Sequence, residues 1–261
     1  MKIGVVGVGV VGGACKFGFE LLGHQVLIHD IRLETTIDNV LDTEVVYVCV
    51  PTPPVDDGSC DVSIVEEVVY ALKDKGYDGI VAIKSTILPG TTDRLASETR
   101  LRVCFVPEFL RERCAITDFT EHHDVCIIGT NDEETYDIVK KCHGNYPDEF
   151  VQLSPTESEF CKYFNNVYNA MLIIFANSFY EICQTMDVNY TNIKNAVIKR
   201  KHINGNYLEC NDNFRGFGGM CLPKDTAAMA TLAKKTKVEF FKDLLKENGK
   251  YRTTVFDGMR K

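Results

Sequence analysis

The stretch Gly7-Val8-Gly9-Val10-Val11-Gly12 decides how the first part of this chain folds. It follows directly on the apolar run Ile3–Val6 and directly precedes a stretch with helical character. In such a GxGxxG turn the first glycine permits the tight turn, the second lets the backbone approach a pyrophosphate, and the third allows close helix packing. The free N–H groups at the start of the helix then face the phosphates. The pattern predicts a dinucleotide site formed by Gly7, Gly9, Val10, Val11 and Gly12.

An acidic residue, Asp30, follows the next apolar run and lies 18 residues after Gly12. A carboxylate at this place accepts hydrogen bonds from ribose hydroxyls and repels a 2′-phosphate, so it favours NAD over NADP. Arg32 lies close by in the sequence and leaves that choice open. The alternative is a structural glycine turn with an acid on the surface, but the strand–turn–helix setting favours the dinucleotide interpretation.

Short apolar runs rich in β-branched residues alternate with amphipathic stretches through the first half of the chain. Such runs are typical of strands buried on both faces of a parallel sheet. Their alternation with helices predicts an α/β fold, a Rossmann-like doubly wound parallel sheet over residues 1–154. The runs are Ile3–Val6, Val26–His29, Glu44–Val50, Ile80–Ile83, Arg102–Val106 and Val125–Ile128, with amphipathic stretches such as Ser63–Lys75 and Asp132–Lys141.

From Pro155 onward the pattern is helical. Residues Pro155–Met186 contain no glycine or proline after the first position and carry apolar side chains at helical spacing. They predict one long helix, with Ser154 or Thr156 as its N-terminal cap. We therefore expect an all-helical central domain over residues 155–261. Its shorter helices are expected at Thr191–Arg200, Asp225–Lys235 and Glu239–Lys246, before a polar tail at Lys250–Lys261.

The composition of the 261 residues argues against several classes of function. The formal net charge is −8 and no basic run exceeds Lys199-Arg200-Lys201, whereas a binder of nucleic-acid backbones needs a basic face. No run of 18 uncharged apolar residues and no secretory signal is found, so we expect no membrane span and a cytoplasmic location.

Eleven cysteines without a CxxC pair suit a reducing compartment. His122-His123 has no third ligand at a suitable spacing, so we expect no metal site.

One cysteine, Cys221, lies in a setting that favours chemistry. It belongs to Gly216-Phe217-Gly218-Gly219-Met220-Cys221-Leu222-Pro223-Lys224-Asp225, whose glycines allow close approach of a ligand. Pro223 suits the first turn of a helix, and a thiol near a helix N-terminus and beside Lys224 has a lowered pKa and forms a thiolate more readily. A buried, inert cysteine is the alternative, and it is the default for the other ten.

Four further segments accompany the cysteine loop in a fixed order along the chain. They are Val48-Cys49-Val50-Pro51-Thr52-Pro53, Lys84-Ser85-Thr86, Val106-Pro107-Glu108-Phe109-Leu110-Arg111-Glu112, and Glu159-Phe160-Cys161-Lys162 followed by Asn166. Together the five segments resemble those of the UDP-glucose/GDP-mannose dehydrogenase family. The resemblance covers roughly residues 1–245.

The resemblance implies a four-electron oxidation of a sugar C6 alcohol to a carboxylate, with two molecules of NAD. For UDP-glucose the product is UDP-glucuronate. In this chemistry the thiolate of Cys221 adds to the aldehyde to form a thiohemiacetal, and the second oxidation gives a thioester.

The resemblance also implies which polar residues assist. Lys162 and Asn166 would stabilise the developing oxyanion, and their four-residue spacing places them on one face of a helix. Asp225, with Lys162, would hold and activate a water. Glu108 and Thr86 would assist acid–base chemistry or position that water. Without the resemblance, a solvated charge is the more common role for a helical lysine such as Lys162, and Asp225 is consistent with a partner of its helix dipole.

Contacts to the ligands are implied in the same way. Besides the glycine turn and Asp30, the cofactor-contacting positions are Thr52, Thr86, Glu112 and Lys224. The substrate-contacting positions are Glu108, Phe109, Leu110, Arg111, Lys162, Asn166, Phe214 and Gly218.

The sequence departs from the family in places that concern substrate binding. The family carries a third, α/β domain that grips the nucleotide, and we expect this chain, which ends at Lys261, to lack it. Cys210–Arg215 stands where a Tyr-Asn-Asn-Pro-type segment is common, and Asn177-Ser178 stands where an Asn-Glu pair is common. Two alternatives therefore stay open: a dehydrogenase of another nucleotide sugar, such as GDP-mannose or a UDP-N-acetylhexosamine, and an NAD-binding remnant without catalysis. The resemblance also implies a homodimer formed through the central helices.

Overall fold

The computed structural model describes residues 1–251, so most of the predicted polar tail at Lys250–Lys261 lies outside the described residues. The chain divides into two compact units. The first comprises Met1–Pro53 and Cys60–Lys162, and the second comprises Pro54–Ser59 together with the chain from Tyr163 onward.

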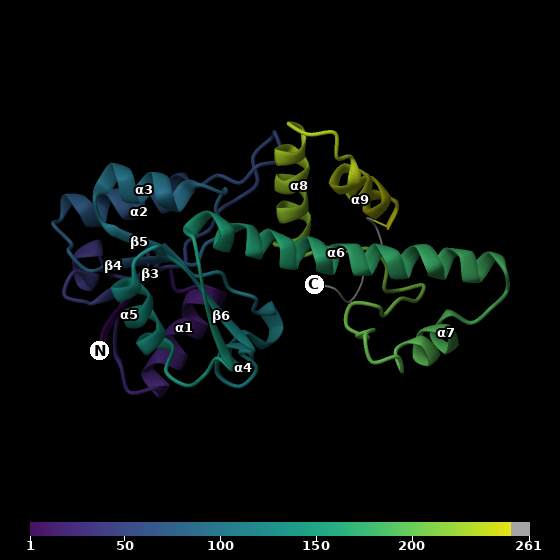
Figure 1. Cartoon of the computed structure of the whole chain (residues 1–261), viewed down its shortest axis with the longest axis horizontal. Coiled ribbons are helices and arrows are strands. Elements are labelled where there is room, and N and C mark those ends of the chain that lie inside the picture. The colour runs from purple at the N-terminus through teal and green to yellow at the C-terminus, as the bar shows by residue number, and fades with distance from the viewer. Residues whose placement is uncertain (252–261) are drawn as a thin grey trace. The chain divides into compact units, whose positions relative to one another are not determined.

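A seven-stranded sheet with the order β2-β1-β3-β4-β5-β6-β7 forms the centre of the first unit (Figure 1). Adjacent strands are parallel except β5 and β6, which meet antiparallel at Phe105 and Gly129. The predicted Rossmann-like α/β fold is confirmed. The strands are β1 (Lys2–Val6), β2 (Gln25–His29), β3 (Val45–Val48), β4 (Ile80–Ile83), β5 (Arg102–Phe105), β6 (Val125–Gly129) and β7 (Glu149–Leu153).

The last strand, β7, is missing from the sequence-based prediction. Its sequence Glu149-Phe150-Val151-Gln152-Leu153 mixes polar and apolar residues, and none of the five is fully buried. It lies at the edge of the sheet, with β6 as its neighbour. An edge strand is half solvated and tolerates polar residues such as Gln152. The opposite edge strand, β2, keeps the apolar run Val26-Leu27-Ile28 and was therefore predicted.

Helices cover both faces of this sheet, as Figure 1 shows for α2 and α3 on one side and α1, α4 and α5 on the other. Side chains alternate along β3: Val45 and Tyr47 join the core beneath α1, while Val46 and Val48 join the core beneath α2. The helices are α1 (Val10–Leu21), α2 (Ser63–Asp74), α3 (Thr91–Thr99), α4 (Ala115–Thr120) and α5 (Glu133–His143), with short 3-10 turns at Ile37–Val40 and Glu112–Cys114.

The predicted long helix is α6, which runs from Pro155 to Thr185. Ser154, rather than Thr156, is its cap: the Glu157 N–H donates to Ser154 Oγ at 3.4 Å, and the Ser154 N–H donates to the Glu157 carboxylate at 3.0 Å. The expected domain boundary at residue 154 marks the start of this helix. The first compact unit, however, continues through the first two turns of α6 to Lys162.

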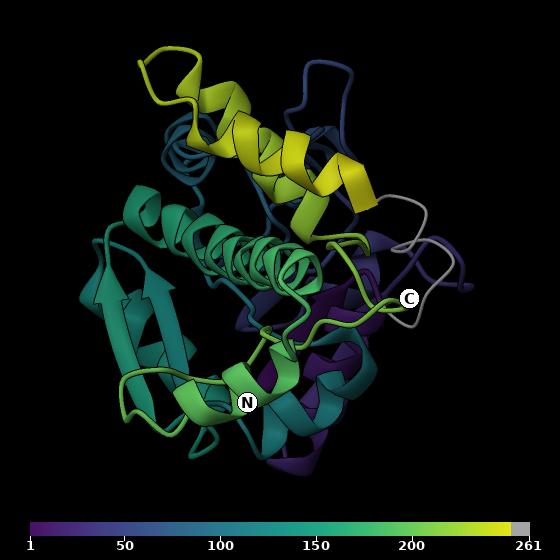
Figure 2. The same cartoon turned by 90° about the vertical axis from the view of Figure 1, so that its right-hand side faces the viewer.

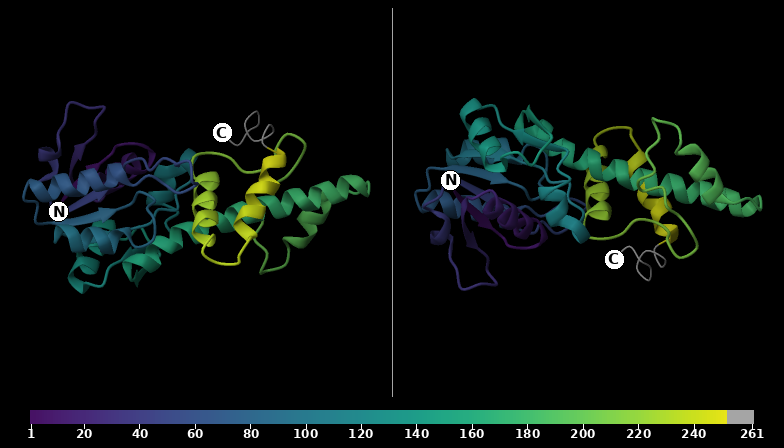
Figure 3. Two further views of the ribbon diagram at one scale, coloured as in Figure 1. Left: turned by 90° about the horizontal axis from the view of Figure 1, so that it is seen from above. Right: turned by 90° about the horizontal axis from the view of Figure 1, so that it is seen from below.

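The second unit is built on the remainder of α6. Figures 1 and 2 show α8 and α9 on one side of this helix and α7 on the other, and in Figure 3 α8 and α9 cross over it. Apolar side chains of α6, α8 and α9 share one core, and those of α6 and the α7 region share another. These helices are α7 (Tyr190–Val197), α8 (Leu222–Ala233) and α9 (Phe240–Asn248), followed by a 3-10 turn at Gly249–Tyr251.

The helix predicted at Asp225–Lys235 begins three residues earlier, at Leu222. Pro223 lies in its first turn, where the missing N–H of proline has no cost, so the helix starts directly after Cys221.

In residues 1–251 no helix combines the length and apolar character needed to cross a membrane.

Candidate functional site

The glycine turn has the backbone geometry that a dinucleotide requires. Gly7 has φ +87°, and a Cβ on it would meet the Cys49 carbonyl oxygen at 2.7 Å. A Cβ on Gly12 would lie 1.9 Å from the Gly7 oxygen, whereas the space around Gly9 is open to at least 4 Å. Gly7 and Gly12 therefore allow the backbone of the turn to pack closely against neighbouring backbone. Gly9 leaves the outer side of the turn accessible to a pyrophosphate.

Asp30 closes the other end of this site directly after β2. The carboxylate is buried and accepts four hydrogen bonds: from Val8 N at 2.7 Å, and from the backbone N, Nε and Nη2 of Arg32, each at 2.9 Å. The bonds from the Arg32 side chain, above all, hold the pKa of Asp30 well below its usual range. An acid that ionises readily beside the glycine turn fits the ribose of NAD, and Arg32 is bonded to that acid although most of its side chain is exposed.

A cavity of about 300 Å³ opens at the start of α1. It brings together two predicted cofactor-contacting residues, Val10 and Glu112, with the chain around α4. The predicted contact Thr52 is buried and is not among the residues that line this cavity. The remaining lining residues are Arg113, Cys114, Ala115, Ile116 and Thr117.

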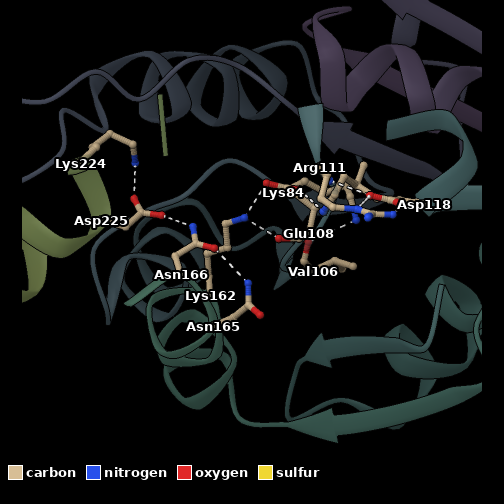
Figure 4. Close-up of polar contacts among 11 residues, drawn as sticks. Lys84, Val106, Glu108, Arg111, Asp118, Lys162, Asn165, Asn166, Lys224 and Asp225 are labelled. Carbon is tan, nitrogen blue, oxygen red and sulfur yellow. Dashed lines mark hydrogen bonds and ion pairs between the residues drawn. The ribbon is translucent and has the colours of Figure 1, made fainter. Parts of the chain in front are cut away.

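Glu108 and Lys162 form a buried ion pair in the first unit (Figure 4). Lys162 Nζ lies 2.6 Å from Glu108 Oε1 and donates to the Glu108 carbonyl oxygen at 2.5 Å. The second carboxylate oxygen of Glu108 accepts from Leu110 N at 2.8 Å, and the ring of Phe109 lies 6.0 Å from the ammonium. Lys162 is therefore not the solvated charge of the alternative reading, since only 4% of its side chain is exposed.

The segment after β4 adds a second buried ammonium. Lys84 Nζ donates to the Val106 carbonyl at 3.3 Å and lies 5.9 Å from the centre of the Tyr47 ring. Thr86, two residues on, is buried, and its carbonyl accepts from the Cys60 thiol at 3.8 Å. Lys84 belongs to the predicted motif Lys84-Ser85-Thr86, but the sequence did not indicate a role for it. The available signal was its position directly after β4, a strand of apolar residues only, where a charged side chain is unusual.

Arg111 is anchored by a residue that the sequence analysis did not single out. The buried carboxylate of Asp118 accepts from Arg111 Nη2 at 2.6 Å, from Nε at 3.0 Å and from the backbone N at 2.8 Å. These bonds lower the pKa of Asp118, the side-chain bonds contributing most. The pair fixes the backbone of the segment that begins with Glu108, while most of the Arg111 side chain remains exposed.

In the second unit, Asp225 is the centre of a polar cluster (Figure 4). Its carboxylate is fully buried and accepts from Asn166 Nδ2 at 2.5 Å and from Lys224 Nζ at 2.6 Å. Asn165 Nδ2 in turn donates to Asn166 Oδ1 at 3.0 Å. The predicted residues Asn166, Asp225 and Lys224 thus come together, and Lys224 directs its ammonium to Asp225.

Cys221 is the residue that precedes α8, and the backbone N–H of Asp225 donates to its carbonyl at 2.9 Å. All eleven cysteines lie within residues 1–251, and among them Cys221 alone is exposed. The alternative of a buried cysteine therefore does not hold for this residue. An exposed thiol at a helix N-terminus, one turn from a buried carboxylate, is suited to nucleophilic chemistry.

The loop before Cys221 is held by an arginine that sequence reasoning missed. The Arg215 guanidinium lies between the rings of Tyr180 and Tyr251, 4.8 and 4.5 Å from their centres, and Nε donates to Asn177 Oδ1 at 2.8 Å. Phe214 and Gly218, the predicted substrate contacts on either side of it, are both partly exposed.

In residues 1–251 no three His, Cys, Asp or Glu side chains are grouped to hold a metal ion.

The glycine turn, the buried acid and the doubly wound sheet are typical of dinucleotide-binding proteins, a class that includes the NAD-dependent dehydrogenases. Comparison with known families narrows this class. Residues 31–146 match the NAD-binding domain, and residues 156–250 the central domain, of the UDP-glucose/GDP-mannose dehydrogenase family. The chain belongs to this family, whose members use NAD.

Individual relatives carry two different substrate names. The chain is 27% identical to a GDP-mannose 6-dehydrogenase of Pseudomonas aeruginosa, over 98% of this chain and 70% of the relative. It is 28% identical to a UDP-glucose 6-dehydrogenase of Haloferax volcanii, over 90% of this chain and 66% of the relative. The solved structure of a UDP-glucose dehydrogenase from Pyrobaculum islandicum matches 97% of this chain and 68% of its own, with a TM-score of 0.87 at 29% identity. The chain thus spans about two thirds of the length of these relatives.

Proposed function

We propose that this chain oxidises the C6 alcohol of a nucleotide sugar to a carboxylate with NAD, and that UDP-glucose is the sugar. The observation that carries the proposal is the cluster of Asn166, Lys224 and the buried Asp225, one helical turn from the exposed thiol of Cys221. An exposed cysteine next to a fully buried, hydrogen-bonded carboxylate has the two groups that a thioester route needs, a nucleophile and a group that activates water.

The cofactor would occupy the glycine turn of the first unit. Gly7, Gly9 and Gly12 would hold the pyrophosphate, Asp30 the ribose, and Val10 and Glu112 line the adjoining cavity. NAD, when bound, supplies the acceptor for a hydride from C6 in each of the two oxidations. The residues of the chain supply orientation, charge and proton transfer.

In the first oxidation the hydroxyl proton at C6 must leave as the hydride leaves. Lys162 is a cation held 2.6 Å from a carboxylate, so its Nζ can stabilise an alkoxide while Glu108 Oε1 takes the proton. The products of this step are the aldehyde, one proton and the hydride, which NAD would accept when bound.

In the second oxidation the Cys221 thiolate forms a bond to the aldehyde carbon and gives a thiohemiacetal. Loss of a second hydride from that carbon gives a thioester on Cys221. Water then adds to the thioester carbon, Asp225 receives the proton of that water, and the carbon–sulfur bond breaks. The carboxylate product leaves and Cys221 again carries a thiol or thiolate, so atoms and electrons balance over two oxidations and one hydrolysis.

A panel of nucleotide sugars tests the proposal. The purified chain is incubated with NAD and, in turn, UDP-glucose, GDP-mannose and a UDP-N-acetylhexosamine, and NADH formation is followed by absorbance. We expect the highest kcat/KM with UDP-glucose. A higher value with GDP-mannose would assign the chain to that substrate. NAD binding without NADH formation from any of the three sugars would favour the remnant.

We also propose that the chain forms a homodimer through its helical unit. Large apolar side chains are exposed along the second part of α6, at Phe175 (53%), Phe179 (46%) and Ile182 (60%), and directly after its end, at Met186 (67%). Their spacing places them on one stripe of the helix, and an apolar stripe of this extent is typical of an interface. Light scattering should report twice the chain mass for the unmodified protein and a monomer for Phe175→Glu.

A further inference from the structure

The carboxylate of Glu159 is fully buried in the first unit and accepts three hydrogen bonds from one place, the start of α3. Gly90 N donates to Oε2 at 2.5 Å, while Thr92 N and Thr92 Oγ1 donate to Oε1 at 2.8 and 2.6 Å. None of the roles proposed above uses Glu159.

This contact replaces a cap that α3 does not have locally. The residue that precedes α3 is Gly90, which has no side chain to receive the free N–H groups of the first turn. Glu159 supplies the missing acceptor from 67 residues farther along the chain than Thr92. A charged acceptor at a helix N-terminus is stabilised by both the hydrogen bonds and the helix dipole. Burial raises the pKa of the Glu159 carboxyl, and the donors of Thr92 and Gly90 oppose that effect.

Glu159 lies three residues before Lys162 on the same helix. The two side chains attach the first turns of α6 to two different parts of the sheet domain: Glu159 to α3, and Lys162 to Glu108 after β5. Two such attachments fix both the rotation of the helix about its axis and its position along that axis. A helix residue advances 1.5 Å and turns about 100°, so a small change in either displaces the Lys162 ammonium from Glu108.

We infer that Glu159 is a positioning residue for Lys162. By capping α3, it holds the start of α6 in the register that keeps the Lys162 ammonium on Glu108. The catalytic part of this inference rests on the proposed function, in which Lys162 stabilises an oxyanion. The structural part, the dependence of Lys162 on the Glu159 cap, stands without it.

The test compares Glu159→Gln with Glu157→Gln in the full chain. Glutamine at 159 keeps the shape but presents an amide N–H₂ group to one of the N–H donors, which removes an acceptor. Glu157 is exposed on the same helix, and within residues 1–251 its side chain bonds only to Ser154. Glutamine serves equally well in that capping arrangement. Thr92→Val is a milder variant that removes one hydroxyl donor to Glu159, and Thr92→Ser restores it.

The first readout is the rate at which an amine-acylating reagent modifies Lys162, followed by peptide mass spectrometry. We expect Glu159→Gln to raise this rate about tenfold and Thr92→Val to raise it less, with Glu157→Gln and Thr92→Ser unchanged. The second readout is steady-state kinetics. A displacement of about 1 Å costs on the order of 10²-fold, so we expect a fall of this size in kcat with the KM for NAD unchanged.

The outcomes separate the two claims. If no variant and no unmodified protein forms NADH, the proposed function fails, and the acylation rates still decide the role of Glu159. Equal acylation rates of Lys162 in folded Glu159→Gln and Glu157→Gln would overturn the inference. If Glu159→Gln does not fold, an unchanged Lys162 rate in Thr92→Val would overturn it.

Discussion

Lys162 Nζ lies 2.6 Å from Glu108 Oε1, and the side chains of both residues are at least nine-tenths buried. A buried pair of this kind is destabilised strongly when one partner is removed, because the other is left as an uncompensated charge. Such a pair is a costly way to stabilise a fold, since apolar residues of the same size serve as well. Its presence after β5 supports a chemical role for both residues.

Lys162→Met should lower the free energy of unfolding by about 3–5 kcal/mol, because it leaves Glu108 charged and buried. The double variant Lys162→Met, Glu108→Gln should regain a large part of that loss and remain inactive. Urea denaturation and NADH formation measure the two effects. An active double variant would contradict the role given to the pair.

The glycine turn offers a matched pair of substitutions. Gly12→Ala should prevent stable folding of the turn, because its Cβ would lie 1.9 Å from the Gly7 oxygen. Gly9→Ala should leave the fold intact, because nothing lies within 4 Å of its Cβ, and should weaken NAD binding instead. Thermal unfolding and calorimetric titration with NAD distinguish the two. Unchanged NAD affinity in Gly9→Ala would contradict the proposed cofactor position.

Asp225 and Asp243 both lie in the first turn of a helix, so both can interact with a helix dipole. Only Asp225 has a proposed chemical role, and Asp243 therefore serves as its control. Asp225→Asn should reduce kcat by about 10²–10⁴-fold, because the proposed acceptor of the water proton is lost. Asp243→Asn should cost at most about 1 kcal/mol of stability and leave kcat unchanged. Comparable kcat values for the two variants would show that Asp225 acts only on its helix.

The stability of the first unit should depend on pH through His123. Burial, above all, lowers its pKa to about 4, and its Nδ1 lies 3.2 Å from the Phe119 carbonyl oxygen. An unfolded histidine has a pKa near 6.5, so below that pH the unfolded chain binds a proton that the folded chain does not. The free energy of unfolding should therefore fall as the pH drops from about 6.5 to about 4, by at most about 3 kcal/mol.

His123→Gln tests this pH dependence, with the exposed neighbour His122→Gln as its control. The slope of unfolding free energy against pH should decrease in His123→Gln and stay as in the unmodified protein in His122→Gln. His143, whose pKa is also lowered by burial, should keep part of the slope in both variants. Identical slopes in all three proteins would contradict the assignment to His123.

Local sequence patterns were sufficient for much of the fold. The glycine turn, the inner strands and α6 all follow from spacing within a few residues, and Pro223 explains the start of α8 at Leu222. The edge strand β7 was not predictable in this way, because Gln152 interrupts its short apolar run.

The residues of the site also differ in how well the local sequence predicts them. Cys221 stood out from its neighbours in sequence, whereas the importance of Glu159 and Arg215 depends on partners 67 and 38 residues away. Long-range hydrogen bonds of buried polar groups leave no periodic signal in a sequence. Only the three-dimensional structure shows that the Glu159 carboxylate is a cap for α3.

The most direct test of the central claim is the amount of NADH formed per molecule of UDP-glucose, measured with limiting sugar for the unmodified chain and for Cys221→Ser. Because Cys221 is exposed, the serine variant should fold as the unmodified chain does. Two NADH per sugar in the unmodified chain, and loss of full turnover in Cys221→Ser, are the predicted results. Two NADH per sugar at an unchanged rate in Cys221→Ser would contradict the thioester route.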